Sequence, residues 1–448
     1  MAEIAIIAGP IRSKLIISNE LAARLRAAGH GVSLIAPPGD AVDAAGLDCL
    51  RSPLRLELPP AGASAAKDRA SRVARCAAAV DAARVDEFRD LLGGLAPDLV
   101  LVDIEEHAHV IAAVTGGLRV ALLNIFFNLW KQPGVPPVHL PITPGVGLAG
   151  SRSGIELAWA RYRLWRWRAL RRARRHGAGY EAQLEAFAAR LGFPLGREVD
   201  YFQGLLPFIY RHLPMVNTNL LEFDLPHAPR PDCYYVGPMT SSDRAGFAFA
   251  QSERHAAATI DRVAAEARQA SPPRKVIYCA FGAYFWGDDH EFWQRVVRAV
   301  TPHPEWTVIL GLGGRVDPAT LGALPGHVHA LAWAPQMHAL SRADCAVVHG
   351  GMTSVYECLQ HEVPILSYPY REIFDQAGTA ARVRYHGLGL VGDRRRDTPE
   401  VIAARIGQVL ANDARRPALA AMRRHIDRAR DEAHAARAIA ALLGEARD

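Results

Sequence analysis

The sequence predicts an α/β protein in which two Rossmann-like layers of parallel strands and helices face each other across a cleft. Short apolar runs alternate with longer helical segments from the N-terminus, which is typical of βαβ units and a parallel sheet. This alternation breaks in residues 125–215, which are rich in Phe, Trp, Pro and Arg, and restarts near residue 275. With 448 residues, the chain is also too long for one compact core. The three observations together favour two domains.

The apolar runs predict the elements in chain order. In the first half, strands are expected at residues 3–8, 31–36, 99–103 and 120–124, with helices near 17–28 and 107–114. A Pro-rich stretch at 225–239 indicates the boundary between the halves. A helix near 253–270 follows, then strands at 275–279, 306–310, 328–331 and 345–348, and amphipathic helices from about 399 to 446.

The composition excludes several classes of protein. Hydrophobic residues make up 50% of the chain and charged residues 22%, which is typical of a globular protein. The six cysteines show neither CxxC pairs nor zinc-like spacing with histidine, which favours a cytoplasmic location and no metal. No G-x-G-x-x-G motif follows the first strand, and the Gly-rich run 311–314 is typical of a turn, so no cofactor is predicted. The first apolar stretch ends at Gly9-Pro10, and no run is long enough to span a bilayer.

The segment 157–175 is rich in Arg and Trp. Without the eight arginines between 161 and 175, the formal net charge of +6 would become −2, so the basic character of the chain is local. On a helical wheel the apolar residues of this segment scatter around the axis, which favours a solvated or domain-packed helix over one that lies on a membrane. We therefore expect only weak, salt-sensitive contact with anionic lipid and no nucleic-acid partner.

The most informative segment for function is residues 333–376. A strand ending at Val348 leads into His349-Gly350-Gly351 and then to Thr353 and Ser354 at the start of a helix. Such a turn offers backbone N–H groups and the positive end of a helix dipole to a diphosphate. Glu357 supplies a carboxylate for ribose hydroxyls, Trp333 a flat face for a base, and Asp375-Gln376 hydrogen-bonding groups for a sugar.

In this order, the motifs W-x-P-Q, H-G-G-x-T-S-x-x-E, V-P-x-x-x-x-P and D-Q resemble the donor-binding signature of the family 1, UDP-dependent glycosyltransferases of GT-B fold. The resemblance extends to V-G-P at 236–238 and F-G at 281–282, and so covers nearly the whole chain. Residues 125–150 are similar to bacterial members that glycosylate hydrophobic acceptors, including carotenoid glucosyltransferases. The resemblance to the family implies an acceptor-binding domain at 1–235, a donor-binding domain at 236–425 and a final helix, 426–448, that packs back on the first domain.

The resemblance also implies a reaction and a donor site. The reaction is an inverting transfer of a sugar from a UDP-sugar to a small hydrophobic or acidic acceptor, without a metal. The implied donor residues are Trp333 and Gln336 for the nucleoside, Gly282, His349, Gly351, Thr353 and Ser354 for the diphosphate, Glu357 for the ribose, and Asp375 and Gln376 for the sugar. Two departures concern this site: two extra residues separate Pro369 from Asp375, and Ala283 replaces a hydroxyl residue.

A third departure concerns the general base. Counted back from Gly29-His30, Lys14 stands where the family carries its catalytic histidine, and Asp103 matches the aspartate that orients it. Lys14 could be the base, but its pKa of about 10.4 would have to fall by about three units. Alternatively, His107 serves as the base, or Lys14 stays charged and binds an anionic acceptor. The cost of neutralising a lysine favours His107 or substrate-assisted transfer.

Two other functions compete with transfer. One is a binding protein that keeps the donor pocket but has lost the base and acts as a sensor or partner. The other is a sugar-nucleotide epimerase on the same fold, which the Trp-Pro-Gln and Asp-Gln motifs argue against.

Overall fold

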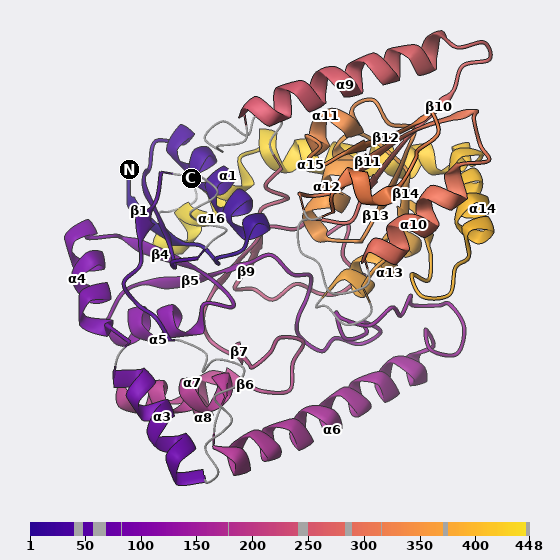
Figure 1. Ribbon diagram of the computed structural model, residues 1–448. Coiled ribbons are helices and arrows are strands. Elements are labelled where there is room, and N and C mark those ends of the chain that lie inside the picture. Colours follow the sequence, from indigo (N-terminus) through magenta and orange to yellow (C-terminus); the bar gives the residue numbers. More distant parts are fainter. Residues whose placement is uncertain are drawn as a thin grey trace.

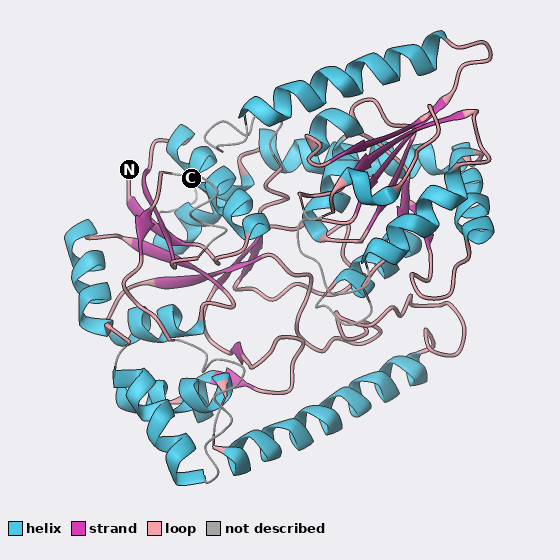
Figure 2. Ribbon diagram, viewed as in Figure 1, coloured by secondary structure: helices cyan, strands magenta, loops and turns pink. Residues whose placement is uncertain are grey.

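A computed structural model of the chain describes residues 1–39, 48–56, 69–81, 83–177, 179–240, 250–282, 289–314, 316–370 and 375–444. These residues form two separate parallel β-sheets, each with helices on both faces (Figures 1 and 2). The predicted α/β class is confirmed.

The first sheet has the strand order β3-β2-β1-β4-β5-β8-β9, with every neighbouring pair parallel. Its strands are β1 (Glu3–Ile7), β2 (Gly31–Ala36), β3 (Leu50–Arg51), β4 (Leu99–Asp103), β5 (Val120–Asn124), β8 (Met215–Asn217) and β9 (Cys233–Tyr235). Alternate residues of β1 pack on opposite faces: Ile4 and Ile6 join the core under α1 (Arg12–Ala27) and α16 (His434–Leu443). Ala5 and Ile7 join the core under α4 (Val85–Leu95) and α5 (His107–Thr115), so this central strand is apolar throughout.

The second sheet repeats the pattern with the order β12-β11-β10-β13-β14-β15. Its strands are β10 (Lys275–Ala280), β11 (Trp306–Gly311), β12 (Val328–Leu331), β13 (Cys345–Val348), β14 (Ile365–Ser367) and β15 (Gly389–Val391). In both sheets the strand order reverses once, between β1 and β4 and between β10 and β13. Ligands of such sheets bind beyond the carboxyl ends of the strands at this reversal, so each half has one expected binding edge.

The remaining helices complete both layers and connect them. Around the second sheet lie α9 (Ala250–Gln269), α10 (Asp289–Val300), α11 (Gln336–Leu340), α12 (Met352–Gln360), α13 (Gln376–Tyr385), α14 (Pro399–Leu410) and α15 (Arg416–Asp431). The first half adds α3 (Arg69–Asp81), α6 (Arg152–His176), α7 (Tyr180–Arg190), α8 (Leu195–Glu198) and the short strands β6 (Val199–Asp200) and β7 (Ile209–Tyr210). None of the described helices has the length and apolar character needed to cross a bilayer.

Two details differ from or extend the sequence-based expectations. Helix α1 begins at Arg12 and not near residue 17, so Lys14 lies in its first turn, directly beyond β1. At the other end of the chain, α16 packs against α1 and β9, beside the first sheet (Figure 1). The domain limits at 235 and 425 stay a prediction.

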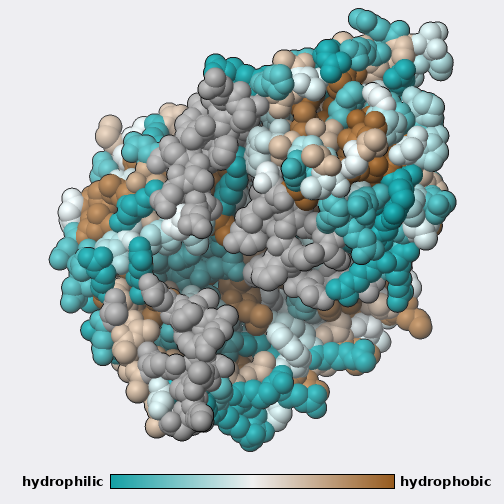
Figure 3. All heavy atoms as spheres, viewed as in Figure 1, coloured by the Kyte–Doolittle hydropathy of each residue, from teal (hydrophilic) through white to brown (hydrophobic). Residues whose placement is uncertain are grey.

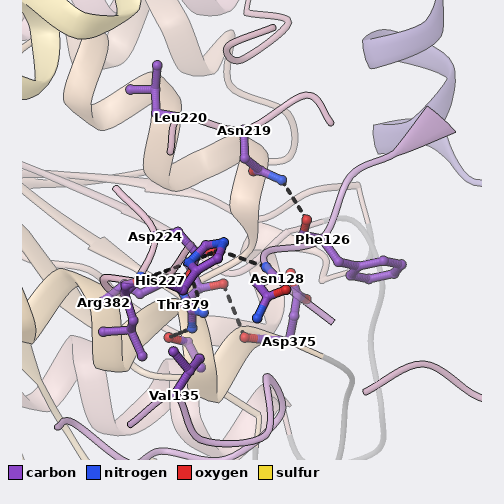
Figure 4. A network of polar contacts seen from close by, with 12 residues as sticks. Phe126, Asn128, Val135, Asn219, Leu220, Asp224, His227, Asp375, Thr379 and Arg382 are labelled. Carbon is purple, nitrogen blue, oxygen red and sulfur yellow. Dashed lines mark hydrogen bonds and ion pairs between the residues drawn. The ribbon is translucent and has the colours of Figure 1, made fainter. Parts of the chain in front are cut away.

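A buried ion pair connects the two halves. Asp224, which follows β8, accepts from Arg382 of α13 at 2.8 Å from Nε and 2.5 Å from Nη2, and both side chains are at most 1% exposed. The guanidinium also lies 4.0 Å from the ring centre of Phe127, and the second carboxylate oxygen accepts from the backbone N–H of Asn128 at 2.7 Å. Figure 4 shows Arg382, Asp224 and Asn128 in this network. The pair holds α13, a helix of the second half, against the first half.

Gly378 permits the close approach of α13. A Cβ atom at this position would lie 1.7 Å from the backbone oxygen of Val138, which belongs to the first half. Any side chain would therefore push α13 away from its partner segment.

We expect Arg382→Met to lower the free energy of unfolding by about 3–5 kcal/mol, because it leaves the Asp224 carboxylate buried without its counter-ion. Arg384→Met, on the exposed face of the same helix, is the matched control and should change stability by less than about 0.5 kcal/mol. Urea denaturation of both variants measures the difference. Equal stabilities would show that the pair does not hold the halves together.

Candidate active site

A cavity of about 650 Å³ lies between the binding edges of the two sheets. Its wall includes residues that follow β1, β4 and β5 in the first half and residues that follow β10, β11 and β13 in the second. Both strand-order reversals therefore open into the same space, as expected for a site that joins two substrates.

Lys14 is the centre of a charged cluster on the first half. Its Nζ lies 2.6 Å from Oδ1 of Asp103, the last residue of β4, and 2.5 Å from Oε2 of Glu105. Asp103 also accepts from the backbone N–H of Glu105 at 3.0 Å. Gly9 provides the room, since a Cβ atom there would lie 2.4 Å from Cδ of Lys14. The side chains of Lys14 and Asp103 are 4% and 1% exposed, whereas that of Glu105 is 26% exposed.

The cluster keeps its lysine charged. Burial alone would lower the pKa of Lys14, but the carboxylates of Asp103 and Glu105 outweigh it and hold that pKa well above its ordinary value. Burial raises the pKa of Asp103 to about 6, although Lys14 opposes the shift. At neutral pH the amine of Lys14 is therefore protonated and the carboxylate of Asp103 is ionised. Of the three residues of the cluster, Lys14 and Glu105 reach the cavity wall.

His107 does not face this cavity, contrary to the sequence-based expectation. It is the first residue of α5, and its imidazole is fully buried, 4.5 Å from the ring of Phe208 and with Nδ1 3.2 Å from the hydroxyl of Tyr210. Burial lowers the pKa of His107 to about 3. The start of α5 turns the imidazole into the core of the first half, and the residue contributes to the wall of a separate side pocket.

The side pocket has a volume of about 480 Å³ and adjoins the cavity, because Glu105 and Tyr180 line both. Ala169 and Ala173 of α6, together with Leu206 and Pro207, give it apolar walls. Glu105 therefore stands where the two spaces meet.

On the second half, His349 follows β13 and is held between two glycines. A Cβ atom at Gly351 would lie 2.4 Å from Nε2 of His349, and one at Gly282 would lie 3.1 Å from the same atom. Gly282 also has a φ of +81°, a backbone conformation that glycine adopts without strain. Burial, helped by the charge of Arg394, lowers the pKa of His349 to about 4, so the imidazole is neutral at physiological pH.

Helix α12 points its N-terminus at the cavity. Gly351 is the N-cap residue and has no side chain to occupy the first N–H groups, and Thr353 and Ser354 of the first turn line the cavity. Unoccupied N–H groups and the helix dipole form a site for an anion.

Glu357 lies one turn further along α12 and is 1% exposed. Gln336, the first residue of α11, donates from Nε2 to its carboxylate and, at 3.1 Å, to the hydroxyl of Ser354. Gln336 therefore fixes the orientation of the carboxylate at the cavity wall.

Trp333 lines the same part of the cavity and already has a partner from the other half. The guanidinium carbon of Arg12, in the first turn of α1, lies 4.1 Å from the centre of the Trp333 ring. One face of the indole is thus covered by a cation.

Asp375 and Gln376 stand at the N-terminus of α13, and both line the cavity. Burial raises the pKa of Asp375 to about 6. The two extra residues before this pair do not remove it from the cavity; residues 371–374 and Ala283 lie outside the described parts of the chain.

Eleven of the thirteen residues singled out from the sequence line the cavity, whereas Asp103 lies behind Lys14 and His107 lies in the core. The eleven are Lys14, Gly282, Trp333, Gln336, His349, Gly351, Thr353, Ser354, Glu357, Asp375 and Gln376. Six lining residues with polar side chains were not selected: Arg12, Ser13, Glu105, Glu106, Tyr180 and Tyr278. The run of titratable residues after Asp103 was the signal for Glu105 and Glu106, but nothing in the sequence marks Tyr180.

Within the described residues, no group of three or more His, Cys, Asp or Glu side chains is arranged to hold a metal ion. The polar groups of the cavity are instead backbone N–H groups, amides, hydroxyls and paired charges.

Comparison with known proteins agrees with this site. Residues 305–436 match the family described as "Erythromycin biosynthesis protein CIII-like, C-terminal domain". The chain is 25% identical to the zeaxanthin glucosyltransferase of Pseudescherichia vulneris over 445 residues, covering 95% of this chain and 94% of that protein. It is also 25% identical to the enzyme of the same name from Pantoea ananas, over 73% of this chain and 67% of that protein.

Solved structures share the fold along the whole chain. The calicheamicin glycosyltransferase CalG4 superposes with a TM-score of 0.65 at 21% identity, with complete coverage of both chains. The glycosyltransferase VinC, solved in complex with DTDP, superposes with a TM-score of 0.59 at 16% identity and covers 99% of this chain and 98% of its own. The two facing sheets thus have the GT-B fold of these solved glycosyltransferases, and the chain is similar in sequence to glycosyltransferases along nearly its whole length.

Proposed function

We propose that this enzyme transfers a sugar from a UDP-sugar to a hydroxyl group of a small hydrophobic acceptor, with inversion at the anomeric carbon. The observation that carries the proposal is that one cavity joins the diphosphate-type cradle of α12 to the charged cluster of Lys14, Asp103 and Glu105. An acceptor at the cluster and a donor in the cradle would meet from opposite sides, which is the geometry of an inverting displacement.

The second half supplies the groups that a leaving diphosphate needs. The N-terminus of α12, the hydroxyls of Thr353 and Ser354 and the neutral imidazole of His349 offer hydrogen bonds to its oxygens. Such preorganised donors stabilise the negative charge that develops as the sugar departs. Asp375 and Gln376, at the start of α13, line the same cavity and would hydrogen-bond the hydroxyls of the transferred sugar.

Glu357 favours a uridine over a deoxythymidine donor. Its carboxylate can accept hydrogen bonds from both hydroxyls of a ribose, whereas a deoxyribose lacks one of them. The structural neighbour VinC was solved with DTDP, so a deoxythymidine diphosphate sugar is the competing donor. The base would use the face of Trp333 that Arg12 leaves open, or displace Arg12.

The side pocket favours a hydrophobic acceptor over an acidic one. Its walls are formed by Ala169, Ala173, Leu206 and Pro207, and its charged members, Glu105 and Glu181, would repel an anion. Lys14 is already paired with two carboxylates, which leaves it little capacity to bind an anionic substrate.

Glu105 is the group best placed to accept the acceptor's proton. Lys14 is held in its protonated form and His107 is a weak, buried base, whereas the Glu105 carboxylate lies 2.5 Å from Nζ of Lys14 and reaches both spaces. The proton of the acceptor hydroxyl passes to Glu105, while the oxygen of that hydroxyl bonds to the anomeric carbon. The bond between that carbon and the diphosphate breaks, and the electron pair leaves with UDP. Lys14 and Asp103 position the carboxylate.

Incubation with radiolabelled UDP-glucose and a mixed set of hydrophobic alcohols tests the proposal. A labelled product with a mass increase of one hexose supports it. Tight UDP binding without turnover would indicate a sensor, and conversion of the donor to its 2-epimer would indicate an epimerase.

For the donor site, we expect Glu357→Ala to weaken UDP binding by roughly tenfold or more, equivalent to about 1.4 kcal/mol, while dTDP binding changes less. His349→Ala should weaken both nucleotides, because it removes a diphosphate contact. Isothermal calorimetry provides the affinities, with Glu266→Ala, an exposed carboxylate on α9, as the control. Unchanged UDP affinity in both variants would refute the assignment of the donor site.

For the base, Glu105→Gln should lower kcat by a factor on the order of 10² to 10⁴ and leave UDP affinity unchanged, because an amide cannot accept the proton. Glu87→Gln, an exposed carboxylate of α4 in the same half, should retain full turnover. Steady-state kinetics distinguishes the two. If Glu105→Gln remains active while His107→Phe loses turnover, the histidine is the base after all.

Replacement of His107 should change the pH dependence of the free energy of unfolding and should not change turnover. Its folded-state pKa of about 3 lies below the value of about 6.5 in an unfolded chain. The contribution of the neutral imidazole to the free energy of unfolding is therefore complete above pH 6.5. It is lost as the pH falls toward 3, by up to about 1.4 kcal/mol per pH unit. Urea titrations between pH 7 and 4 should show a shallower decline in His107→Phe than in the wild type or in His255→Phe, an exposed control on α9. Parallel declines would contradict a buried neutral imidazole.

A further inference from the structure

The loop before α6 and the outer face of α6 expose apolar side chains at high density. Of the twelve large apolar side chains that are exposed among the described residues, six lie between positions 146 and 167. They are Val146, Leu148, Leu157, Leu164, Trp165 and Trp167. Leu148 is 92% exposed and the others are 41–55% exposed. Such a concentration is typical of a contact surface.

Positive charge lies among these apolar groups. Arg161, Arg168, Arg172 and Arg175 are exposed, and within the described residues none of them has a carboxylate at ion-pair distance. Arg166 is different, because it is buried and paired with Glu181 at 2.5 Å. The outer face of the helix therefore carries uncompensated charge.

The structure shows that α6 has a buried face and an exposed face, which the sequence did not distinguish. Ile155, Trp159, Tyr162, Arg166 and Leu170 are buried and fix α6 to the first half. Trp159 and Leu170 thus point inward, whereas Leu164, Trp165 and Trp167 point to solvent. The apolar residues seemed scattered on the helical wheel because they belong to two different faces of the helix. In Figure 1, α6 runs along the lower edge of the molecule, and in Figure 3 that edge shows hydrophilic residues interrupted by hydrophobic ones.

We propose that the outer face of α6 and the loop at residues 144–151 bind the surface of a bilayer that contains anionic lipids. The unpaired arginines complement lipid phosphates, and Trp side chains are favoured at the level of the headgroups. Leu148 and Leu157 add apolar area that enters the boundary of the acyl chains. A nucleic acid would use the arginines but would have no use for these leucines. Because charged and apolar groups alternate on one face, the helix lies shallowly on the bilayer.

The same helix borders the side pocket. Ala169 and Ala173 of α6 line this pocket together with Leu206, which is itself 46% exposed. Docking through α6 would bring the pocket close to the membrane, so an apolar acceptor could enter without crossing water. This route rests on the proposed function, whereas binding to the bilayer does not.

Flotation of the purified full-length chain with vesicles tests the surface directly. We expect binding to vesicles of phosphatidylcholine with phosphatidylglycerol and little binding to phosphatidylcholine alone. Arg168→Gln combined with Arg172→Gln should lower binding to the anionic vesicles roughly tenfold or more. The matched control is Arg424→Gln with Arg428→Gln, an exposed pair of the same spacing on α15, which should bind as the wild type does.

The tryptophans separate a bilayer from other acidic partners. Trp165→Ala with Trp167→Ala should abolish the part of vesicle binding that persists at moderate salt, because salt screens the arginines but not the apolar contact. Thermal unfolding shows that the variants are folded. The proposal is overturned if the wild type does not float with anionic vesicles at low salt, if the tryptophan variant binds like the wild type, or if α6 is covered by a second copy of the chain in lipid-free solution. A failure of sugar transfer would leave the vesicle result unaffected.

Discussion

The buried ion pair between Arg382 and Asp224 is the constraint on which the site depends. It connects α13 of the second half to the segment after β8 of the first, and the same helix carries Asp375 and Gln376 at its N-terminus. This charge interaction therefore ties the helix that carries the residues proposed to hold the sugar to the first half, beside other contacts such as that of the backbone N–H of Leu220 with the hydroxyl of Tyr356. Gly378 contributes by letting the helix backbone approach that of Val138. Removing one charge would leave the other in a site with almost no access to water, which is why neither partner is easily replaced.

The two sides of the cavity use electrostatics differently. The wall formed by the second half, the proposed donor side, holds His349 neutral by burial and presents the N-terminus of α12, whereas the wall formed by the first half, the proposed acceptor side, concentrates charged groups around Lys14. Lys14 has two carboxylate partners that hold its pKa well above the ordinary value, so it does not give up its proton readily. In the proposed reaction the proton therefore passes to one of those carboxylates, and Glu105 is the one that reaches the cavity. In this proposal Lys14 is a positioning residue, because its Nζ lies 2.5 Å from Oε2 of Glu105 and orients that carboxylate.

The cavity, the side pocket and α6 adjoin one another. Glu105 and Tyr180 separate the cavity from the side pocket, and the side pocket is bordered by the inner edge of α6. The outer face of that helix carries the exposed arginines and tryptophans. A path from the molecular surface to the charged cluster thus passes along a single helix, and the apolar walls of the pocket match the kind of acceptor that a membrane would supply.

The sequence by itself determined the α/β class, the bounds of the eight strands that it predicted to within a residue, and the residues around His349 and Glu357 that line the cavity, because these depend on local alternation and on residues close together in the chain. Only the tertiary structure decided the acceptor side. The first turn of α1 starts at Arg12 and brings Lys14 into contact with Asp103, which is 89 residues away in the chain. No local sequence pattern predicts a contact between residues so far apart. Likewise, the spacing after Asp103 did not show that His107 turns into the core while Glu105 faces the cavity, because side-chain direction there depends on packing against Phe208 and Tyr210. The two faces of α6 became distinct for the same reason: burial, and not composition, selects which tryptophans meet solvent.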